Sequence, residues 1–335
     1  MNPILVTPFP RPRGVFKVLH LPFLARLYYY IYHQPSASRV QMRFKQILRK
    51  LFPVIRRFSH AKGKFEYQRQ GKSIPILFNA RNVQFHALYA SPNGFEPDVS
   101  GVLDALLPEG GTFFDIGSNW GYFSLYTASK YSRLTVHAFE PMPETYQDLA
   151  NCVKQAGLSD LVTCHNLALS DADGNASIDM TDGVHSGTAT VSRKGGSIKI
   201  VTRRMDSLKL PKPDFIKMDV EYHELEVLKG AKEMLTAARP HIVFENKAEN
   251  IQPENALEVL FFLSELGYKL YVPAVQRRQA RSYFMIPWWH PIGDGENLAL
   301  IPLKPEERPL LSDLNIFACH ESRQHELLTV FKTWP

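Results

Sequence analysis

The stretch that decides the fold runs from Asp115 to Phe123 and reads Asp-Ile-Gly-Ser-Asn-Trp-Gly-Tyr-Phe. An apolar run, Thr112 to Ile116, leads into it, and an amphipathic stretch, Tyr122 to Lys130, follows it. Glycines let the backbone turn sharply towards a ligand, and a helix start offers unpaired N–H groups and positive potential. The pattern therefore predicts a strand, a glycine turn and a helix that bind a ligand. Dinucleotides and triphosphates are disfavoured, because the spacing is G-x-x-x-G and no P-loop lysine follows.

Outward from this stretch, short apolar runs alternate with amphipathic segments, which predicts βαβ units and an α/β fold with a mostly parallel sheet. The seven candidate strands are Thr112 to Ile116, Leu134 to Phe139, Val162 to Leu169, Asp214 to Val220, His241 to Glu245, Tyr268 to Val272 and Leu298 to Pro302. The candidate helices between them are Tyr122 to Lys130, Pro143 to Ala156, Glu224 to Ala238 and Pro253 to Leu266. Between Ala176 and Leu208 the pattern favours two or three antiparallel strands inserted into the sheet.

Acidic residues lie at the ends of several predicted strands. Glu140 ends the second strand, 25 residues after Asp115, and Pro141 stops the strand there. A carboxylate at this point of a doubly wound sheet can accept both hydroxyls of a ribose, so the pair favours nucleoside binding over a solvated turn. Asp219 ends the fourth strand at the same ligand-binding edge.

The segment after Asp219 offers further titratable groups. If the backbone stays extended, Asp219, Glu221 and His223 point to one side near the ligand. Glu224 and Glu226 are expected to be solvated acids in the first turn of the following helix.

Five motifs together resemble the FkbM-type S-adenosylmethionine-dependent methyltransferases. They are D-x-G-x-N-x-G-x-F-S from Asp115, F-E-P from Phe139, N-x-A-L-S-D from Asn166, K-x-D-V-E-x-x-E-x-x-V-L-K-G from Lys217 and I-V-F-E from Ile242. The resemblance covers about residues 101–266. It implies a Rossmann-like class I methyltransferase fold, with helices on both faces of a seven-stranded, mostly parallel sheet whose last strand is antiparallel. It also implies methyl transfer, usually to oxygen.

The resemblance and the chemistry of the residues together give candidate roles to residues of this chain. The cofactor-binding candidates for S-adenosylmethionine are Asp115, Gly117, Ser118, Asn119, Gly121, Tyr122, Glu140, Asn166 and Ala168. The candidates for the general base are His223, Asp219, Glu221 and Glu245. The candidates for acceptor contacts are Tyr222, His185, Trp288 and Trp289. Asp219 and Glu221 could instead hold a divalent cation, but the metal-free interpretation is favoured, so no metal site is predicted.

This sequence departs from the family at one point that matters. The family commonly has Gly after D-V-E, whereas Tyr222 and His223 follow Glu221 here. The change alters bulk and titratable chemistry at the acceptor edge, so the acceptor and the identity of the base stay open.

The net charge of +6 is divided unevenly along the chain. Residues 1–70 hold 14 Lys and Arg against one acid, a net charge of +13, and the remaining residues sum to −7. Val40 to Phe58 predicts a basic amphipathic helix, which Pro53 should bend or split. Residues 17–58 either lie on an anionic membrane or pack on the domain with solvated basic side chains. The predicted division is a basic helical N-terminal region (1–70), a methyltransferase domain (71–305) and a C-terminal tail (306–335).

Taken together, the sequence predicts O-methylation of a saccharide, glycolipid or polysaccharide precursor. Three scattered cysteines favour the cytoplasm, with peripheral attachment to the inner membrane face as an extension of that prediction. The apolar run from Val18 to Tyr32 is too short and too broken to span a bilayer. The alternatives are methylation of nucleic acid or another small molecule, or an inactive membrane-surface interaction module. Nucleic acid is disfavoured, because Asp-Val-Glu stands where base methylases carry Asn/Asp-Pro-Pro-aromatic.

Overall fold

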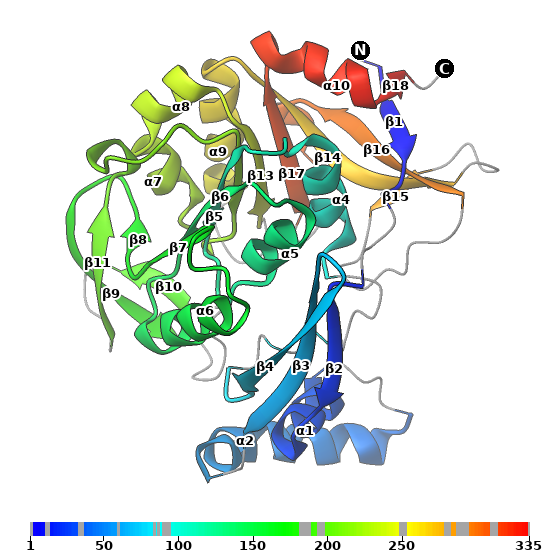
Figure 1. The fold of residues 1–335 in the computed structure, drawn as a ribbon, viewed down its shortest axis with the longest axis vertical. Coiled ribbons are helices and arrows are strands. Elements are labelled where there is room, and N and C mark those ends of the chain that lie inside the picture. The colour runs from blue at the N-terminus through cyan, green and yellow to red at the C-terminus, as the bar shows by residue number, and fades with distance from the viewer. Residues whose placement is uncertain are drawn as a thin grey trace.

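A computed structural model describes residues 3–10, 14–32, 37–58, 61–82, 85, 88, 95–180, 189–192, 198–247, 253–277, 283–285, 295–308 and 314–333. Its centre is an 11-stranded sheet with the order β18-β1-β16-β14-β17-β13-β12-β5-β6-β7 and with β15 paired to β14 (Figure 1). The strands are β1 (Leu5–Pro8), β5 (Thr112–Ile116), β6 (Thr135–Phe139), β7 (Val162–His165), β12 (Phe215–Met218), β13 (His241–Asn246), β14 (Tyr268–Arg277), β15 (Tyr283–Met285), β16 (Glu296–Leu303), β17 (Leu314–His320) and β18 (Lys332–Thr333).

The parallel half of the sheet follows the sequence prediction. β7, β6, β5, β12 and β13 pair in parallel, and helices connect several of them in sequence. The predicted mostly parallel α/β fold is therefore confirmed for this half.

The antiparallel half corrects the prediction. β17 lies antiparallel between β13 and β14, whereas the predicted seventh strand, within β16, lies on the other side of β14. The interpretation of residues 306–335 as a tail is therefore wrong. The sheet exceeds seven strands because β1, β15, β16 and β18 extend this side.

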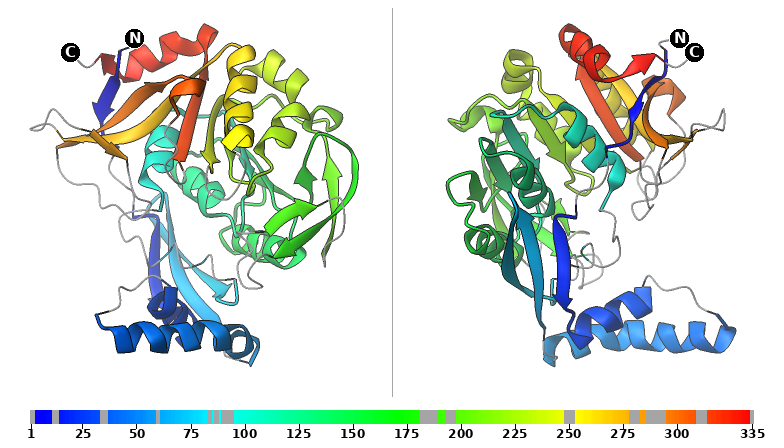
Figure 2. Two further views of the ribbon diagram at one scale, coloured as in Figure 1. Left: turned by 180° about the vertical axis from the view of Figure 1, so that it is seen from behind. Right: turned by 45° about the vertical axis from the view of Figure 1, so that its right-hand side comes forward.

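Two layers of helices cover the central sheet (Figure 2). Adjacent strand residues point to opposite faces, so Phe113 packs with the residues of α4 (Pro97–Leu106), α5 (Tyr122–Lys130) and α6 (Pro143–Gln155). Phe114 packs on the other face with α7 (Glu224–Lys229), α8 (Lys232–Ala238) and α9 (Pro253–Glu265). Both faces of the parallel strands are thus buried, which leaves the strand ends as the accessible part.

The antiparallel strands predicted between Ala176 and Leu208 form a separate sheet. Its order is β10 (Ala189–Ser192), β9 (Gly174–Met180), β11 (Ile198–Arg203) and β8 (Ala168–Leu169). The predicted strand from Val162 to Leu169 breaks into β7 and β8 at Asn166, and β8 pairs with β11 instead of the central sheet. These strands are therefore not inserted into the central sheet.

A third sheet joins an N-terminal helical pair to the body. It consists of β2 (Phe16–His20), β3 (Lys62–Arg69) and β4 (Lys72–Asn79), and Tyr67 Oη in β3 donates to the carbonyl of Leu125 at 2.9 Å. The pair is α1 (Phe23–Tyr32) and α2 (Arg39–Phe58), at the opposite end of the molecule from β1 (Figure 1). The predicted basic helix is confirmed, and Pro53 does not split it. Among the described helices, none has the length and apolar character needed to cross a membrane.

Residues 1–70 are not an independent appendage. β1 pairs with β16 and β18 in the central sheet, and Phe65 and Tyr67 of β3 are fully buried. The first 70 residues thus contribute to two sheets as well as to the helical pair.

Candidate functional site

The glycine turn after β5 lies at the carboxyl ends of the parallel strands. Gly117 has φ +71°, and a Cβ there would lie 1.8 Å from the backbone oxygen of Asp219. Asn119 (φ 51°) and Gly121 (φ 94°) also take left-handed conformations before α5 begins at Tyr122. The absence of a side chain at Gly117 therefore lets the turn touch the end of β12, and the N-terminus of α5 opens at the same place.

Glu140 connects this turn to the next strand end. The backbone N–H of Asn119 donates to Glu140 Oε2 at 3.0 Å, and that of Met142 donates to Oε1 at 2.9 Å. Burial raises the pKa of Glu140 to about 7, although these two hydrogen bonds oppose the rise. Each carboxylate oxygen can accept a further hydrogen bond, so Glu140 keeps the capacity to receive two hydroxyl donors.

Asp115 is fully buried at the end of β5. Its Oδ2 accepts a hydrogen bond from Ser124 Oγ at 2.6 Å, whereas its Oδ1 accepts none from any described residue. Burial raises the pKa of Asp115, and the charge of Lys217 opposes that rise. A buried acceptor without a partner is costly, so Oδ1 fits a donor group on a ligand.

The other predicted cofactor contacts have varied surroundings. Ser118 Oγ donates to the carbonyl of Phe139 at 3.2 Å, and Asn166 Nδ2 donates to the carbonyl of Glu140 at 2.9 Å, so both side chains brace the turns. Tyr122 and Ala168 are buried in the cores, and Tyr122 Oη accepts the N–H of Phe95 at 2.8 Å. These side chains therefore support the turns of the site through hydrogen bonds and packing.

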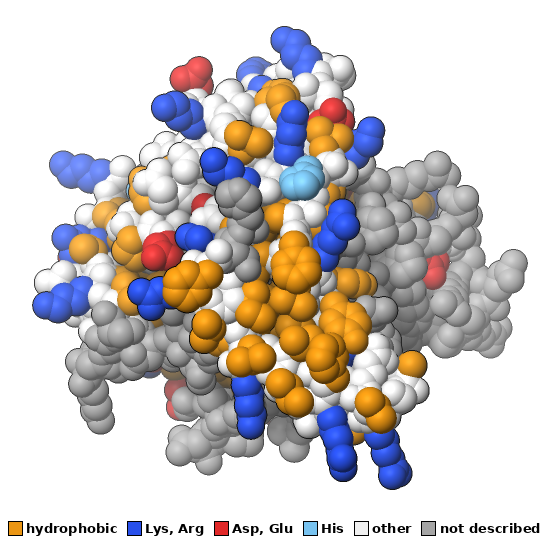
Figure 3. Space-filling view, turned by 90° about the horizontal axis from the view of Figure 1, so that it is seen from below, with side chains coloured by type: hydrophobic (Ala, Val, Ile, Leu, Met, Phe, Trp, Pro, Cys, Tyr) orange, Lys and Arg blue, Asp and Glu red, His pale blue; other side chains and the backbone are white. Residues whose placement is uncertain are grey.

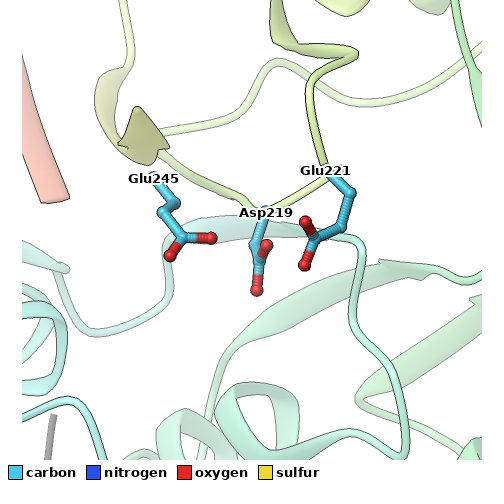
Figure 4. Close-up of side chains that lie close together, drawn as sticks. All are labelled: Asp219, Glu221 and Glu245. Carbon is cyan, nitrogen blue, oxygen red and sulfur yellow. The ribbon is translucent and has the colours of Figure 1, made fainter. Parts of the chain in front are cut away.

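Three carboxylates meet beside the glycine turn (Figure 4). Asp219, Glu221 and Glu245 each place an oxygen within 4.8 Å of the other two, and we call them the carboxylate cluster. Lys247 Nζ lies 2.6 Å from Glu221 Oε2 and 3.1 Å from Glu245 Oε2. Lys217 Nζ, which is buried, lies 3.5 Å from Asp219 Oδ2. Two ammonium groups therefore lie within ion-pair distance of the three acids.

Burial and neighbouring charges shift the pKa values of carboxyls in and near this cluster. Burial, followed by the charge of Asp219, raises the pKa of Glu245 well above its ordinary value, while Lys247 opposes the rise. Burial also raises the pKa of Glu96, at the start of α4, to about 8, and the charge of Lys217 opposes this rise. A carboxyl with a raised pKa suits proton transfer near neutral pH.

The predicted grouping of His223 with Asp219 and Glu221 is wrong. Glu221 (φ 48°) and Tyr222 (φ 70°) are both left-handed, so the backbone turns instead of staying extended. His223 is 9% exposed, and its Nε2 lies 3.0 Å from Ser170 Oγ in a hydrogen bond. Its role as a base stays a prediction, but it is not a member of the cluster.

Other expectations have mixed outcomes. Glu224, expected to be solvated, is only 8% exposed, and burial raises its pKa to about 7. The half-buried Tyr222 has Lys247 Nζ 5.7 Å from its ring centre. His185, Trp288 and Trp289 lie outside the described residues.

The sequence interpretation missed Lys247 and Glu96. Lys247 follows Glu245 by two residues at the end of β13, a strand-like spacing that could have indicated a shared face. Glu96 lies far from the motifs in sequence, and no local signal points to it.

Comparisons with known proteins point to one family. The methyltransferase FkbM domain family matches residues 115–270. The hexuronic acid methyltransferase AglP of Haloferax volcanii is 32% identical over 168 residues, which cover 49% of this chain and 67% of that protein. Methyltransferase sdnD of Sordaria araneosa is 28% identical, with 38% of this chain and 63% of that protein covered.

Solved structures include similar chains. The crystal structure of methyltransferase FkbM from Methylobacillus flagellatus KT is 18% identical with a TM-score of 0.38, and the match covers 57% of this chain and 43% of that chain. The precorrin-6y C5,15-methyltransferase of Geobacter metallireducens GS-15 is 15% identical with a TM-score of 0.34, and the match covers 67% of this chain and 89% of that chain.

Proposed function

We propose that this chain, which belongs to the FkbM family of methyltransferases, transfers a methyl group from S-adenosylmethionine to a hydroxyl oxygen of a saccharide. Family membership supports the methyl transfer, and similarity to the hexuronic acid methyltransferase of Haloferax volcanii supports a saccharide acceptor. The observation that carries the proposal is the pairing of Glu140 with the glycine turn, next to the carboxylate cluster.

The residues present fit S-adenosylmethionine. Glu140 keeps acceptor capacity for the two ribose hydroxyls, and the unpartnered buried Oδ1 of Asp115 fits a donor at the amino-acid end. The N-terminus of α5 offers N–H groups and positive potential to a carboxylate. When bound, the cofactor supplies an electrophilic methyl group on a sulfonium sulfur.

The carboxylate cluster is proposed to receive the acceptor. Carboxylate oxygens accept hydrogen bonds from sugar hydroxyls, and several on one edge can orient a diol. We assign the hydroxyl proton to Glu245, because burial and the charge of Asp219 raise its pKa and so make it a stronger proton acceptor. Lys247, paired with both Glu221 and Glu245, holds these carboxylates in place.

No cation is required by this proposal. Lys247 Nζ already lies between Glu221 and Glu245, at the distances of direct ion pairs, so a metal ion bound by both would compete with this ammonium. Chelator treatment is therefore expected to leave methyl transfer unchanged. A loss that Mg²⁺ restores would contradict the assignment of Lys247.

The test has two stages. Calorimetry first measures the binding of S-adenosylmethionine, with Glu140→Gln as the variant expected to lose affinity and Glu144→Gln, an unassigned acid in α6, as the matched control. Methyl-labelled cofactor is then incubated with lipid, polysaccharide, nucleic-acid and protein fractions, and label is expected in the saccharide-bearing ones. Label in nucleic acid alone would overturn the acceptor class. No heat of binding would overturn the enzymatic proposal and favour an inactive interaction module.

A further inference from the structure

The helix α2 leaves a continuous apolar face uncovered by the described protein. The residues on it recur at intervals of three and four, and all are large and exposed: Val40 (78%), Phe44 (52%), Ile47 (57%), Leu51 (49%), Val54 (59%) and Phe58 (80%). At about 100° per residue these positions fall within roughly 80° of the helix circumference. Figure 3 shows hydrophobic side chains gathered on this end of the molecule, with Lys and Arg at its edges.

This apolar face is not the one that holds α2 to the protein. α2 packs on α1 through Phe52, which is fully buried and lies 5.7 Å from the ring of Tyr28 and 5.9 Å from the ring of Tyr32. Lys45, on the same side as Phe52, is 4% exposed and lies 4.7 Å from the centre of the Tyr30 ring. The helix is thus anchored by one face while a second apolar face remains outside.

Basic side chains flank the exposed face. Arg39, Arg43, Lys50 and Arg57 are all exposed and fall on one side of the apolar positions around the helix. Residues 17–58 hold nine Lys and Arg and no acid. Phe23 (66% exposed) and Leu19 (44%) add apolar surface in and beside α1. We call the exposed apolar face of α2 and its basic row the foot surface.

We infer that the foot surface binds an anionic membrane, with the α2 apolar face in the headgroup region and the basic row on the phosphates. An amphipathic helix of this kind, basic on one flank and aromatic and aliphatic on its apolar face, lies in the plane of the interface. A nucleic acid would use the basic row but would gain little from six exposed apolar side chains. A contiguous apolar patch that no partner covers is unfavourable in water, and patches of this kind mark protein or membrane interaction sites.

The position of the foot surface favours attachment of the whole chain. α1 and α2 form one end of the molecule, and the sheet β2-β3-β4 joins them to the body (Figure 2). The carboxylate cluster lies in the body, so membrane binding and methyl transfer use different residues. This inference therefore does not depend on the proposed function.

The test requires point substitutions in the full chain. Removing the N-terminal residues would also remove β1, which belongs to the central sheet, and β3, which belongs to the sheet β2-β3-β4. Co-sedimentation is measured with vesicles of phosphatidylglycerol and phosphatidylcholine in equal parts and with pure phosphatidylcholine. Leu51→Glu is the variant of the apolar face, and Leu328→Glu in α10 (Gln324–Val330) is the control, since Leu328 is 61% exposed at the opposite end.

Each variant has a distinct expected result. The parent chain and Leu328→Glu bind the anionic vesicles alike, and both bind pure phosphatidylcholine much more weakly. Leu51→Glu lowers the partition coefficient about tenfold or more, the loss expected for one large apolar side chain. Arg43→Gln and Lys50→Gln each lower it about fivefold, because one cation at an anionic surface contributes a factor of that size. Circular dichroism confirms that each variant stays folded.

Several outcomes would overturn the inference. Equal binding to anionic and neutral vesicles would show that the basic row does not contribute to binding. Unchanged binding by Leu51→Glu would show that the apolar face does not contribute. If sedimentation velocity shows a dimer that Leu51→Glu dissociates, the face covers a second copy of this chain instead. Binding to RNA that needs Lys50 but not Leu51 would assign the basic row to nucleic acid.

Discussion

The burial of Glu140 predicts that cofactor affinity depends on pH. Burial raises the pKa of Glu140 to about 7, so in the free protein about one-tenth of this carboxyl is ionised at pH 6 and most of it at pH 8. The ionised form accepts two hydroxyl donors while it keeps its backbone N–H partners, whereas the protonated form loses one acceptor position. The dissociation constant of S-adenosylmethionine is therefore expected to fall about tenfold between pH 6 and pH 8.

Calorimetry at pH 6, 7 and 8 measures this change. At pH 6, binding should release a proton, which shows as a heat that varies with the ionisation enthalpy of the buffer. Glu140→Gln removes the titrating group and places an amide donor against one of two backbone N–H groups, which costs roughly 1–3 kcal/mol. Its affinity should be low and flat with pH. If the parent affinity is the same at pH 6 and pH 8, or if the variant keeps the parent's slope, the role of Glu140 is refuted.

Three further predictions concern neighbouring residues. Gly117→Ala places a methyl group 1.8 Å from a facing backbone oxygen at φ +71°, so thermal unfolding and cofactor affinity should both suffer strongly. Gly71→Ala, at φ +75° with open space around it, should show only the backbone cost of about 1–2 kcal/mol. Lys247→Met removes the ammonium that favours ionised cluster carboxylates, so the acidic limb of the pH–rate profile should move to higher pH. His223→Ala and Ser170→Ala break the same 3.0 Å hydrogen bond, so both variants should lower the melting temperature and turnover alike. A loss of turnover confined to His223→Ala would instead assign the base to this imidazole.

The parts of the site that the sequence predicted correctly depend on local rules. A strand that ends in an acid, followed by Gly117 and Gly121, specifies a tight turn into a helix wherever it occurs. Glu140 lies at the end of the neighbouring strand because consecutive strands of a parallel sheet tend to lie next to one another. Short-range backbone chemistry and this topological rule were enough to bring Asp115, Gly117 and Glu140 together.

The sequence prediction was wrong where the backbone conformation of one or two residues changes the direction of the chain. The expected grouping of His223 with Asp219 required an extended backbone, but two consecutive non-glycine residues adopt positive φ. Such a conformation is rare for Glu and Tyr, so propensity could not have indicated it. Family resemblance offered the one clue, because Gly is common at the position of Tyr222. The structure keeps the left-handed turn without that glycine.

The position of β17 between β13 and β14 could not be predicted from local sequence patterns. Deleting β17 tests how much it contributes to stability. The strand β17 lies between β13 and β14, and its Leu314, Ile316 and Phe317 are buried in the cores on the two faces of the sheet. Full burial of three such side chains contributes roughly 5–9 kcal/mol. That amount is comparable with the whole stability of a typical domain. Deleting residues 309–335 should therefore abolish the cooperative thermal transition, because it also exposes the edges of β13 and β14 in the middle of the sheet. Deleting residues 332–335 removes only the edge strand β18 and should leave the transition in place. If the longer deletion still melts cooperatively, the burial of β17 contributes much less to stability than this estimate.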